Sequence, residues 1–316
     1  MNALTDRWVP HPLASALLEG LRERPRAVAP KFFYDAAGSA LFDRICELPE
    51  YYPTRTETAL LAAHAHEMAE CIGPAAELVE YGAGSLRKVR LLLEALRRPA
   101  RYLPIDLSAE HLRQHALQLA ADHPQLPVEP LVADFSAAID LPPMAPGARR
   151  RVGFFPGSSI GNFTPDEARG FLERAAHALR GGGLLIGVDL VKDPALLHRA
   201  YNDAEGVTAA FNKNLLARAN RELGADFDLD NFDHYAFYEP RLQRIEMHLV
   251  SRRRQRVRLC GEVFEFAQGE PLHTEISCKY TVDGFGALAR AAGWRPQATW
   301  VDPAQLFSVH WLAAPA

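Results

Sequence analysis

Short apolar runs alternate with amphipathic stretches through the middle of the chain. The runs are rich in Leu, Val, Ile, Phe and Tyr, whereas the stretches between them repeat their apolar positions with the period of a helix. This alternation predicts an α/β fold in which helices cover both faces of a parallel sheet. The predicted strands are 77–81, 101–105, 128–132, 151–155 and 184–190, and the predicted helices include 56–71, 88–98 and 109–122.

Two of the helix starts carry capping signals. Thr54 with Glu57, and Thr164 with Glu167, have the spacing of a capping box, in which each side chain accepts a hydrogen bond from a free backbone N–H. Asn162 lies between a central predicted strand and the second of these helices. It therefore sits at the carboxyl end of a strand, where open α/β sheets bind their ligands.

The rhythm of the pattern changes after residue 190. A helical region is predicted from Asp193 to about Leu223, and a strand that alternates strictly between apolar and polar side chains follows at 244–249. The remaining predictions are strands at 257–266 and 273–280, a helix at 282–292, and strands at 298–301 and 306–312 that form an antiparallel edge.

These patterns divide the chain into two discontinuous parts. We predict a doubly wound domain formed by 56–191 and 282–316, and a smaller α+β lobe formed by 1–55 and 192–281.

Composition predicts a soluble globular protein. Of the 316 residues, 48% are hydrophobic and 23% are charged. The sequence has no apolar run long enough to span a bilayer, and the segment from Met1 to Trp8 lacks the pattern of a secretory signal. We therefore predict a cytoplasmic location. The four cysteines form no C-x-x-C pair, which predicts reduced thiols and no metal site. They are Cys46, Cys71, Cys260 and Cys278.

The net charge of −4 argues against a general attraction to nucleic acid. One basic cluster, at 252–258, lies between two predicted strands. We predict that it is a solvated hairpin turn rather than a nucleic-acid contact.

A glycine-rich turn follows the first predicted strand. It has the form Glu80-x-Gly82-x-Gly84, and Asp106 ends the next strand about twenty residues later. Glycines let the backbone approach a ligand, and an acid on the next strand accepts hydrogen bonds from ribose hydroxyls, so the pair predicts an adenosine-type cofactor. A dinucleotide fingerprint would need a third glycine where Arg87 stands, which favours S-adenosylmethionine over a nicotinamide cofactor. A plain turn at the end of a strand is the alternative.

Several sequence blocks resemble, in the same order, those of the S-adenosylmethionine-dependent histidine Nα-methyltransferases of ergothioneine biosynthesis. The resemblance extends over nearly the whole chain. It implies a class I, Rossmann-like methyltransferase domain with a second α+β substrate-binding lobe. The blocks are FYDAAGSALF (33–42), LPEYYPTRTE (48–57), GSSIGN (157–162), DLVKD (189–193), RAYNDA (199–204) and TEISCK (274–279).

The resemblance also implies a cofactor site. S-adenosylmethionine would lie on the glycine turn, with its ribose hydroxyls on the acid that ends the second strand and its adenine on an Asp-Phe pair. Without the family, Lys88 would be a solvated helix residue and the Asp-Phe pair an ordinary strand end. The implied cofactor residues are Gly82, Gly84, Lys88, Asp106, Asp134 and Phe135.

The same resemblance implies an amino-acid site. Alternate residues of a strand share a face, so Glu275 and Ser277 would offer an acceptor and a hydroxyl to the two nitrogens of an imidazole. A solvent-facing pair on a hairpin is the alternative, and Met247 and Phe42 would by default be core residues. The implied catalytic residues are Tyr34, Asn162 and Tyr201; the implied substrate contacts are Tyr51, Asn162, Tyr201, Glu275, Ile276, Ser277, Met247, Phe42 and Gly157.

The implied reaction is a direct displacement in which a neutral α-amine of histidine attacks the sulfonium methyl group. Three rounds would give the trimethylated betaine, hercynine, and neither a metal nor a covalent nucleophile is required. Transfer to another amino acid such as tryptophan or tyrosine, and a catalytically silent cofactor-binding protein, are the alternatives. Pro156 and His248 depart from the family pattern, which favours leucine and tryptophan there. We expect a small-molecule substrate, no nucleic-acid or membrane partner, and a monomer.

Overall fold

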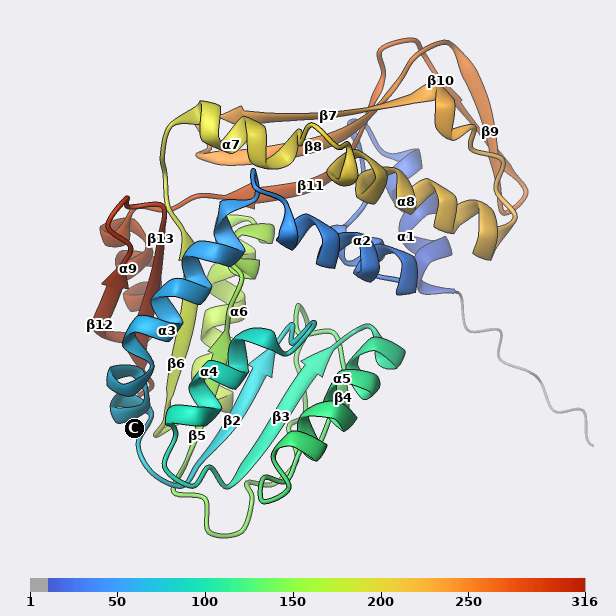
Figure 1. The fold of residues 1–316 in the computed structure, drawn as a ribbon. Helices are drawn as coiled ribbons and strands as arrows, with labels where there is room; N and C mark the ends of the chain where they lie inside the picture. Colours follow the sequence, from blue (N-terminus) through green and yellow to red (C-terminus); the bar gives the residue numbers. More distant parts are fainter. Residues whose placement is uncertain (1–10, 316) are drawn as a thin grey trace, which may run out of the picture.

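The computed structural model describes residues 11–315, which form two main sheets with helices packed around them (Figure 1). Trp8 and the other residues before 11 lie outside this range. The larger sheet has the strand order β12-β13-β6-β5-β2-β3-β4. Strands β2 to β6 are parallel, whereas β13 is antiparallel to both β6 and β12, which confirms the predicted α/β fold and its antiparallel edge. The strands are β2 (Ala76–Tyr81), β3 (Arg101–Asp106), β4 (Leu131–Val132), β5 (Arg150–Phe155), β6 (Gly183–Asp189), β12 (Arg295–Val301) and β13 (Phe307–Ala313).

Helices cover both faces of the larger sheet. Its central strands are therefore buried on both sides and consist almost entirely of buried residues. On one face, Leu61, Val89 and Leu119 from three helices share an apolar cluster with the sheet. On the other face, Phe171 and Phe285 belong to a second cluster. The helices are α3 (Tyr52–Ile72), α4 (Arg87–Ala95) and α5 (Ala109–Asp122) on the first face, and α6 (Pro165–Ala178) and α9 (Val282–Ala291) on the second.

One of the two predicted capping boxes forms. The Thr164 side chain accepts from the Glu167 N–H, and the Glu167 carboxylate accepts from the Thr164 N–H at 2.8 Å, so α6 begins as predicted. The box at Thr54 is wrong, because α3 starts two residues earlier and Thr54 lies within its first turn. Glu57 is buried and forms an ion pair with Lys88 instead.

The smaller sheet has the order β1-β11-β8-β7 and carries an apolar core of its own. That core combines Leu17 and Ile45 from the N-terminal helices with Phe211, Phe232 and Leu272 from the second half of the chain. The elements around it are α1 (Pro12–Arg22), β1 (Arg26–Ala27), η1 (Pro30–Phe33), α2 (Ala36–Glu47), α7 (Pro194–Tyr201), α8 (Val207–Leu223), η3 (Leu229–Asn231), β7 (Phe232–Glu239), β8 (Arg244–Ser251), β9 (Gln255–Leu259), β10 (Glu262–Phe266) and β11 (Pro271–Cys278).

The helical region predicted from Asp193 to Leu223 is two helices, α7 and α8. The chain breaks at Gly206, which has a left-handed φ of 71°. The Asp203 carboxylate accepts hydrogen bonds from the N–H groups of Val207 and Thr208 at 2.7 and 2.8 Å, so it satisfies the free donors at the start of α8.

Two predicted strands also differ from the structure. The run 257–266 is a hairpin that turns at Cys260 and Gly261, both of which have positive φ, as a tight hairpin turn requires. The run 128–132 forms a strand only at its end, as β4. Pro130 within that run has no N–H to donate to a neighbouring strand.

The basic cluster at 252–258 begins at the turn after β8 and continues along β9. Each of its five arginines forms an ion pair with an aspartate or glutamate, so its charge is compensated locally. The four cysteines are free thiols, as predicted. Within residues 11–315, no helix combines the length and the apolar character needed to cross a bilayer.

Candidate active site

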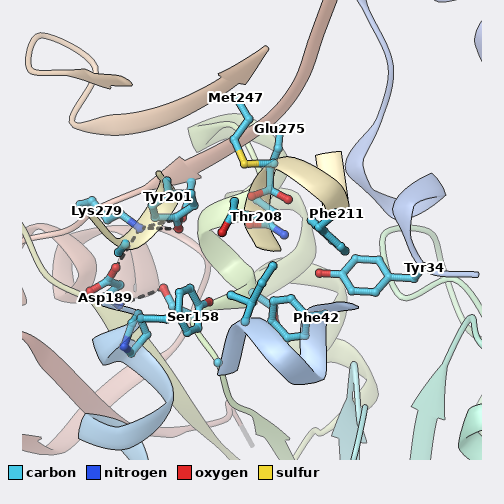
Figure 2. Close-up of a pocket in the computed structure, with 18 residues that line it drawn as sticks. Tyr34, Phe42, Ser158, Asp189, Tyr201, Thr208, Phe211, Met247, Glu275 and Lys279 are labelled. Carbon is cyan, nitrogen blue, oxygen red and sulfur yellow. Dashed lines mark hydrogen bonds and ion pairs between the residues drawn. The ribbon is translucent and has the colours of Figure 1, made fainter. Parts of the chain in front are cut away.

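A cavity lies between the two sheets, beside the carboxyl ends of β5 and β6 (Figure 2). Its walls come from the N-terminal segment, the loop after β5, helices α7 and α8, and strands β8 and β11. All the predicted catalytic and substrate-binding residues except Ile276 line it. They are Tyr34, Phe42, Tyr51, Gly157, Asn162, Tyr201, Met247, Glu275 and Ser277.

Strand β11 and the residue that follows it present Glu275, Ser277 and Lys279 to the cavity, because alternate residues of a strand share a face. All three side chains are buried. Ile276 points to the opposite face, where the register pairs it with Glu246 of β8. Its side chain therefore does not line the cavity, and contact of Ile276 with the substrate stays a prediction.

Lys279 belongs to a buried charge network that the sequence analysis missed. Its Nζ lies 2.8 Å from Oδ2 of Asp189 at the end of β6, and the Lys192 Nζ lies 2.5 Å from Oδ1 (Figure 2 labels Asp189 and Lys279). The Tyr52 hydroxyl also donates to the Asp189 carboxylate. An isolated buried charge costs several kcal/mol, so mutual pairing holds these groups in place.

The network leaves a positive charge beside the cavity. Burial raises the pKa of Asp189, but the positive charges of Lys279 and Lys192 lower it by a larger amount. The net pKa therefore lies below the ordinary aspartate value. Burial alone would lower the pKa of Lys279, whereas the Asp189 carboxylate brings it above the ordinary lysine value. Burial lowers the pKa of Lys192 to about 8, so Lys279 is the firmly charged member of the pair.

The hydroxyls of Tyr201 and Ser277 form a hydrogen-bonded chain with Lys279. The Tyr201 hydroxyl donates to the Ser277 Oγ at 2.8 Å, and the Lys279 Nζ donates to the same Oγ at 2.7 Å and to the Tyr201 oxygen at 3.1 Å. Because the Ser277 Oγ accepts twice, its own hydrogen is left to donate to another group. Burial raises the pKa of Tyr201, so its phenol stays neutral at physiological pH.

Glu275 is a buried carboxylate without a hydrogen bond or ion pair to its side chain within residues 11–315. Burial raises its pKa to about 7, and the positive charge of Lys279 offsets part of that effect. Such a group is costly unless a ligand supplies a hydrogen-bond donor.

We expect Glu275→Gln to raise the free energy of unfolding at pH 8. The folded-state pKa of about 7 exceeds the ordinary glutamate value of 4.5, so the wild-type protein loses stability as the pH rises from 4.5 through 7. The variant avoids that loss and should gain roughly 2–3 kcal/mol at pH 8, with little gain at pH 4.5.

Urea unfolding at several pH values measures this difference. Glu110→Gln, which changes an exposed glutamate on α5, is the matched control and should have no comparable effect. A stability difference for Glu275→Gln that does not vary with pH would contradict the buried-carboxylate account.

Aromatic rings form the wall opposite β11 (Figure 2). Tyr34 meets Phe42 edge-on with ring centroids 5.7 Å apart, and Phe42 meets Tyr51 in the same way at 6.2 Å. Phe211 of α8, which the sequence analysis did not select, packs 5.6 Å from Tyr34. Burial raises the pKa of both tyrosines well above the ordinary value, so the wall presents neutral phenols.

Asn162 reaches the cavity from η2 (Ser159–Asn162), a short helix after β5. A Cβ at Gly161 would lie 2.8 Å from the Cys278 carbonyl oxygen, so glycine allows η2 to pack directly against β11. The Ser158 Oγ accepts from the Asp189 N–H at 2.9 Å and joins the same loop to β6. The backbone around Asn162 is therefore fixed from two sides.

The glycine turn after β2 forms an open cradle. Gly82 and Gly84 both have positive φ, and the Gly84 N–H donates to Oδ2 of Asp106 at 3.1 Å. A Cβ at Gly82 would lie 3.3 Å from the Phe135 ring, whereas one at Gly84 would point into open space. The turn, the acid and the ring therefore fit an adenosine-type group.

Like Asp106, the implied cofactor residues Lys88 and Asp134 have partners within the protein. Lys88 pairs with Glu57, whose carboxylate also accepts from the Gly157 N–H at 2.8 Å, so α4 is joined to the cavity loop. Asp134 accepts a hydrogen bond from the Lys31 Nζ at 2.8 Å. Direct contact of Lys88 and Asp134 with the cofactor stays a prediction.

The strand order, the glycine turn after the central strand β2 and the acid at the end of β3 define a class I, Rossmann-like methyltransferase that depends on S-adenosylmethionine. A family model described as "Histidine-specific methyltransferase, SAM-dependent" matches residues 13–314. The chain belongs to this family.

Three relatives illustrate the similarity. Histidine N-alpha-methyltransferase of Mycolicibacterium smegmatis is 44% identical over 296 residues, which cover 92% of this chain and 91% of the relative. Histidine N-alpha-methyltransferase of Mycobacterium tuberculosis is 43% identical with the same coverage. Ergothioneine biosynthesis protein 1 of Neurospora crassa is 31% identical over 88% of this chain, but the match covers 32% of that longer protein.

Proposed function

We propose that this protein transfers methyl groups from S-adenosylmethionine to the α-amine of L-histidine. The observation that carries the proposal is the pair of Glu275 and Ser277, a buried carboxylate that accepts and a hydroxyl whose hydrogen is left to donate. A neutral imidazole has one N–H donor and one bare nitrogen acceptor, so the pair complements both ring nitrogens. The names of two relatives more than 40% identical to this chain describe the same activity.

The substrate's amine and carboxylate would bind to Tyr51, Asn162 and Tyr201, with Tyr34 close by. All four line the cavity. The Lys279 ammonium lies 3.1 Å from the Tyr201 hydroxyl oxygen, and a nearby positive charge favours the neutral, nucleophilic form of an amine. The protein's part is to orient the nitrogen through hydrogen bonds and to ease loss of its proton.

The glycine cradle is the proposed cofactor site. When bound, S-adenosylmethionine supplies an electrophilic sulfonium methyl group. Alignment of the amine by the cavity residues is then the main contribution of this chain to the rate. The proposed cofactor contacts are Gly82, Gly84, Lys88, Asp106, Asp134 and Phe135.

We also propose three successive transfers, which give the trimethylated betaine. The amine loses one N–H donor with each methyl group, so one acceptor in the site loses its partner each time. A neutral hydroxyl or amide tolerates this loss better than a carboxylate, whose charge would be left unpaired. The rings of Tyr34, Phe42 and Phe211 offer faces that attract a methylated ammonium group.

Mass spectrometry of histidine incubated with the protein and S-adenosylmethionine tests the proposal. Products heavier by one, two and three methyl groups, together with S-adenosylhomocysteine, are expected. Methylation of tryptophan or tyrosine in place of histidine would support another amino-acid methyltransferase. Cofactor binding without any methylated amino acid would support a silent binding protein.

We expect Glu275→Ala to lower kcat/KM for histidine by one to two orders of magnitude. The variant loses a charged hydrogen bond of about 1.5–3 kcal/mol to the imidazole N–H. The kcat/KM for tryptophan should fall less in this variant. In the wild-type site an indole satisfies the buried carboxylate less well than an imidazole does, so tryptophan has less to lose. Competition assays with both amino acids measure the change.

Glu110→Ala, at an exposed site on α5, is the matched control and should retain wild-type kinetics. Histidine kinetics that stay unchanged in Glu275→Ala would remove imidazole recognition from the proposal.

We further propose that 56–191 with 282–316 forms the cofactor domain, and 1–55 with 192–281 the substrate lobe. The apolar cluster that joins residues 13–52 to residues 197–272, separate from the two clusters of the larger sheet, supports this division. Helix α3 begins at Tyr52, so it spans the proposed boundary at residue 56.

A further inference from the structure

A second cluster of chemically active side chains lies on the smaller sheet, outside the cavity. Met247 of β8 points into the cavity, whereas its neighbours Glu246 and His248 point to the opposite face. The register places His273 of β11 directly beside His248. Two imidazoles and one carboxylate therefore meet behind the strands that line the substrate cavity.

The three side chains are close enough to share one ion. Glu246, His248 and His273 each offer a ligand atom, and these atoms lie within 4.8 Å of one another. The His248 Nε2 is 3.1 Å from Oε2 of Glu246, and the two imidazole centroids are 4.8 Å apart. Ligand atoms around a tetrahedral zinc ion lie about 3.3 Å apart, so small side-chain rotations would complete the geometry.

Neighbouring groups already orient two of the ligands. The His273 Nε2 lies 3.1 Å from the Glu275 backbone carbonyl oxygen, a contact that fixes the ring and leaves Nδ1 for an ion. Arg244 donates to Oε1 of Glu246 at 2.9 Å and leaves Oε2 on the side of the histidines. The positive charge of Arg244 opposes a cation, and it already pairs with the one negative charge of Glu246. The two neutral imidazoles therefore carry most of the proposed binding.

His248 is held in place by packing rather than by a full set of hydrogen bonds. Its ring stacks on Phe237 with centroids 5.5 Å apart and planes at 11°. Its Nδ1 is buried without a hydrogen-bond partner within residues 11–315, and its Nε2 contacts only Glu246 there. Neutral imidazole is the commonest metal ligand in proteins, and the His248 Nε2 already faces the Glu246 carboxylate.

We propose that Glu246, His248 and His273 bind one divalent transition-metal ion, with water completing its coordination. Imidazole ligands favour ions such as Zn²⁺, Ni²⁺ and Cu²⁺, whereas Mg²⁺ and Ca²⁺ prefer oxygen ligands alone. The side chains of Glu246 and His248 keep 14% and 13% of their surface exposed, so an ion reaches them from solvent. The prediction of no metal site rested on the cysteine spacing. Glu246 and His248 lie two residues apart on β8, but only the register with β11 brings His273 beside them.

The ion has a structural role in this proposal and takes no part in methyl transfer. It would clamp β8 to β11 behind Met247, at the irregular register between His273 and Glu275. The bound ion would therefore stabilise the strands that carry the proposed imidazole contacts.

Titration of chelator-stripped full-length protein with Co²⁺ and Zn²⁺ at pH 7.5 tests the site. We expect one equivalent of Co²⁺ to give visible d–d absorption, Zn²⁺ to displace it, and Zn²⁺ to raise the Tm. His248→Phe keeps a ring against Phe237 but removes a ligand, and His273→Ala removes another. Each should weaken binding at least about tenfold.

His177→Ala, which removes an exposed histidine on α6, is the matched control and should bind as the wild type does. Circular dichroism and histidine methylation report separately whether each variant is folded. Absence of a stoichiometric Co²⁺ complex in the wild type would overturn the site. Wild-type affinity in folded His248→Phe or His273→Ala protein would do the same, and neither result bears on the methyltransferase proposal.

Discussion

Asn162→Ala is expected to lower kcat for histidine methylation by about a hundredfold or more, because a displacement of about 1 Å in a reacting group costs a factor of that size. The amide enters the cavity from η2, which packs against β11 through Gly161 and so has little freedom to adjust. Affinity for S-adenosylmethionine should stay near the wild-type value, since the glycine cradle lies on a different loop. Single-turnover methyl transfer and calorimetry measure the two quantities.

Asn231→Ala is the control for this experiment, because Asn231 lies in η3 and does not line the cavity. It should show normal turnover. A variant at Asn162 that lost most of its cofactor affinity, or that retained a nearly normal rate, would contradict the proposed role in orienting the amine.

Lys279→Met is expected to lower the free energy of unfolding by roughly 3–5 kcal/mol, the usual effect of removing one partner from a buried ion pair. Asp189 would keep Lys192 and Tyr52 but lose its contact with Lys279. Ser277 and Tyr201 would also lose the ammonium that donates to both, so KM for histidine should rise. Urea unfolding and steady-state kinetics measure these effects.

Lys213→Met provides the matched control. Lys213 is half-buried on α8 and forms no ion pair within residues 11–315, so its loss should change stability by less than about 1 kcal/mol. If Lys279→Met were equally mild, the buried network would not be holding the substrate-facing hydroxyls.

Much of the candidate site follows from local sequence patterns. The alternation of β11 places Glu275 and Ser277 on one face, and the same period of two would have led to Lys279. The capping box at Thr164 fixes the start of α6 and so places Asn162 just before it. Ile276 belongs to the same sequence block, but its side chain points away from the cavity because neighbouring residues of a strand face opposite sides.

Other residues depend on contacts between distant segments. The position of Asp189 at the end of an apolar strand is visible in the sequence. No local pattern shows, however, that Lys192, Lys279 and Tyr52 converge on it. Glu57 has the spacing of a capping residue, yet it is buried against Lys88 because α3 begins earlier than the pattern suggests.

The sequence by itself determined the α/β class, the order of most elements, the glycine turn after the first strand of the larger sheet and the family of this protein. Those features rest on short-range periodicity, glycine conformation and blocks of contiguous residues. The tertiary structure alone decided which charges are buried together, which aromatic rings close the cavity, and that two histidines and a glutamate meet behind it. The physical reason is that these arrangements depend on strand register and on the packing of one sheet against the other. The interactions that set register and packing arise between residues far apart in the chain, so no local pattern shows them.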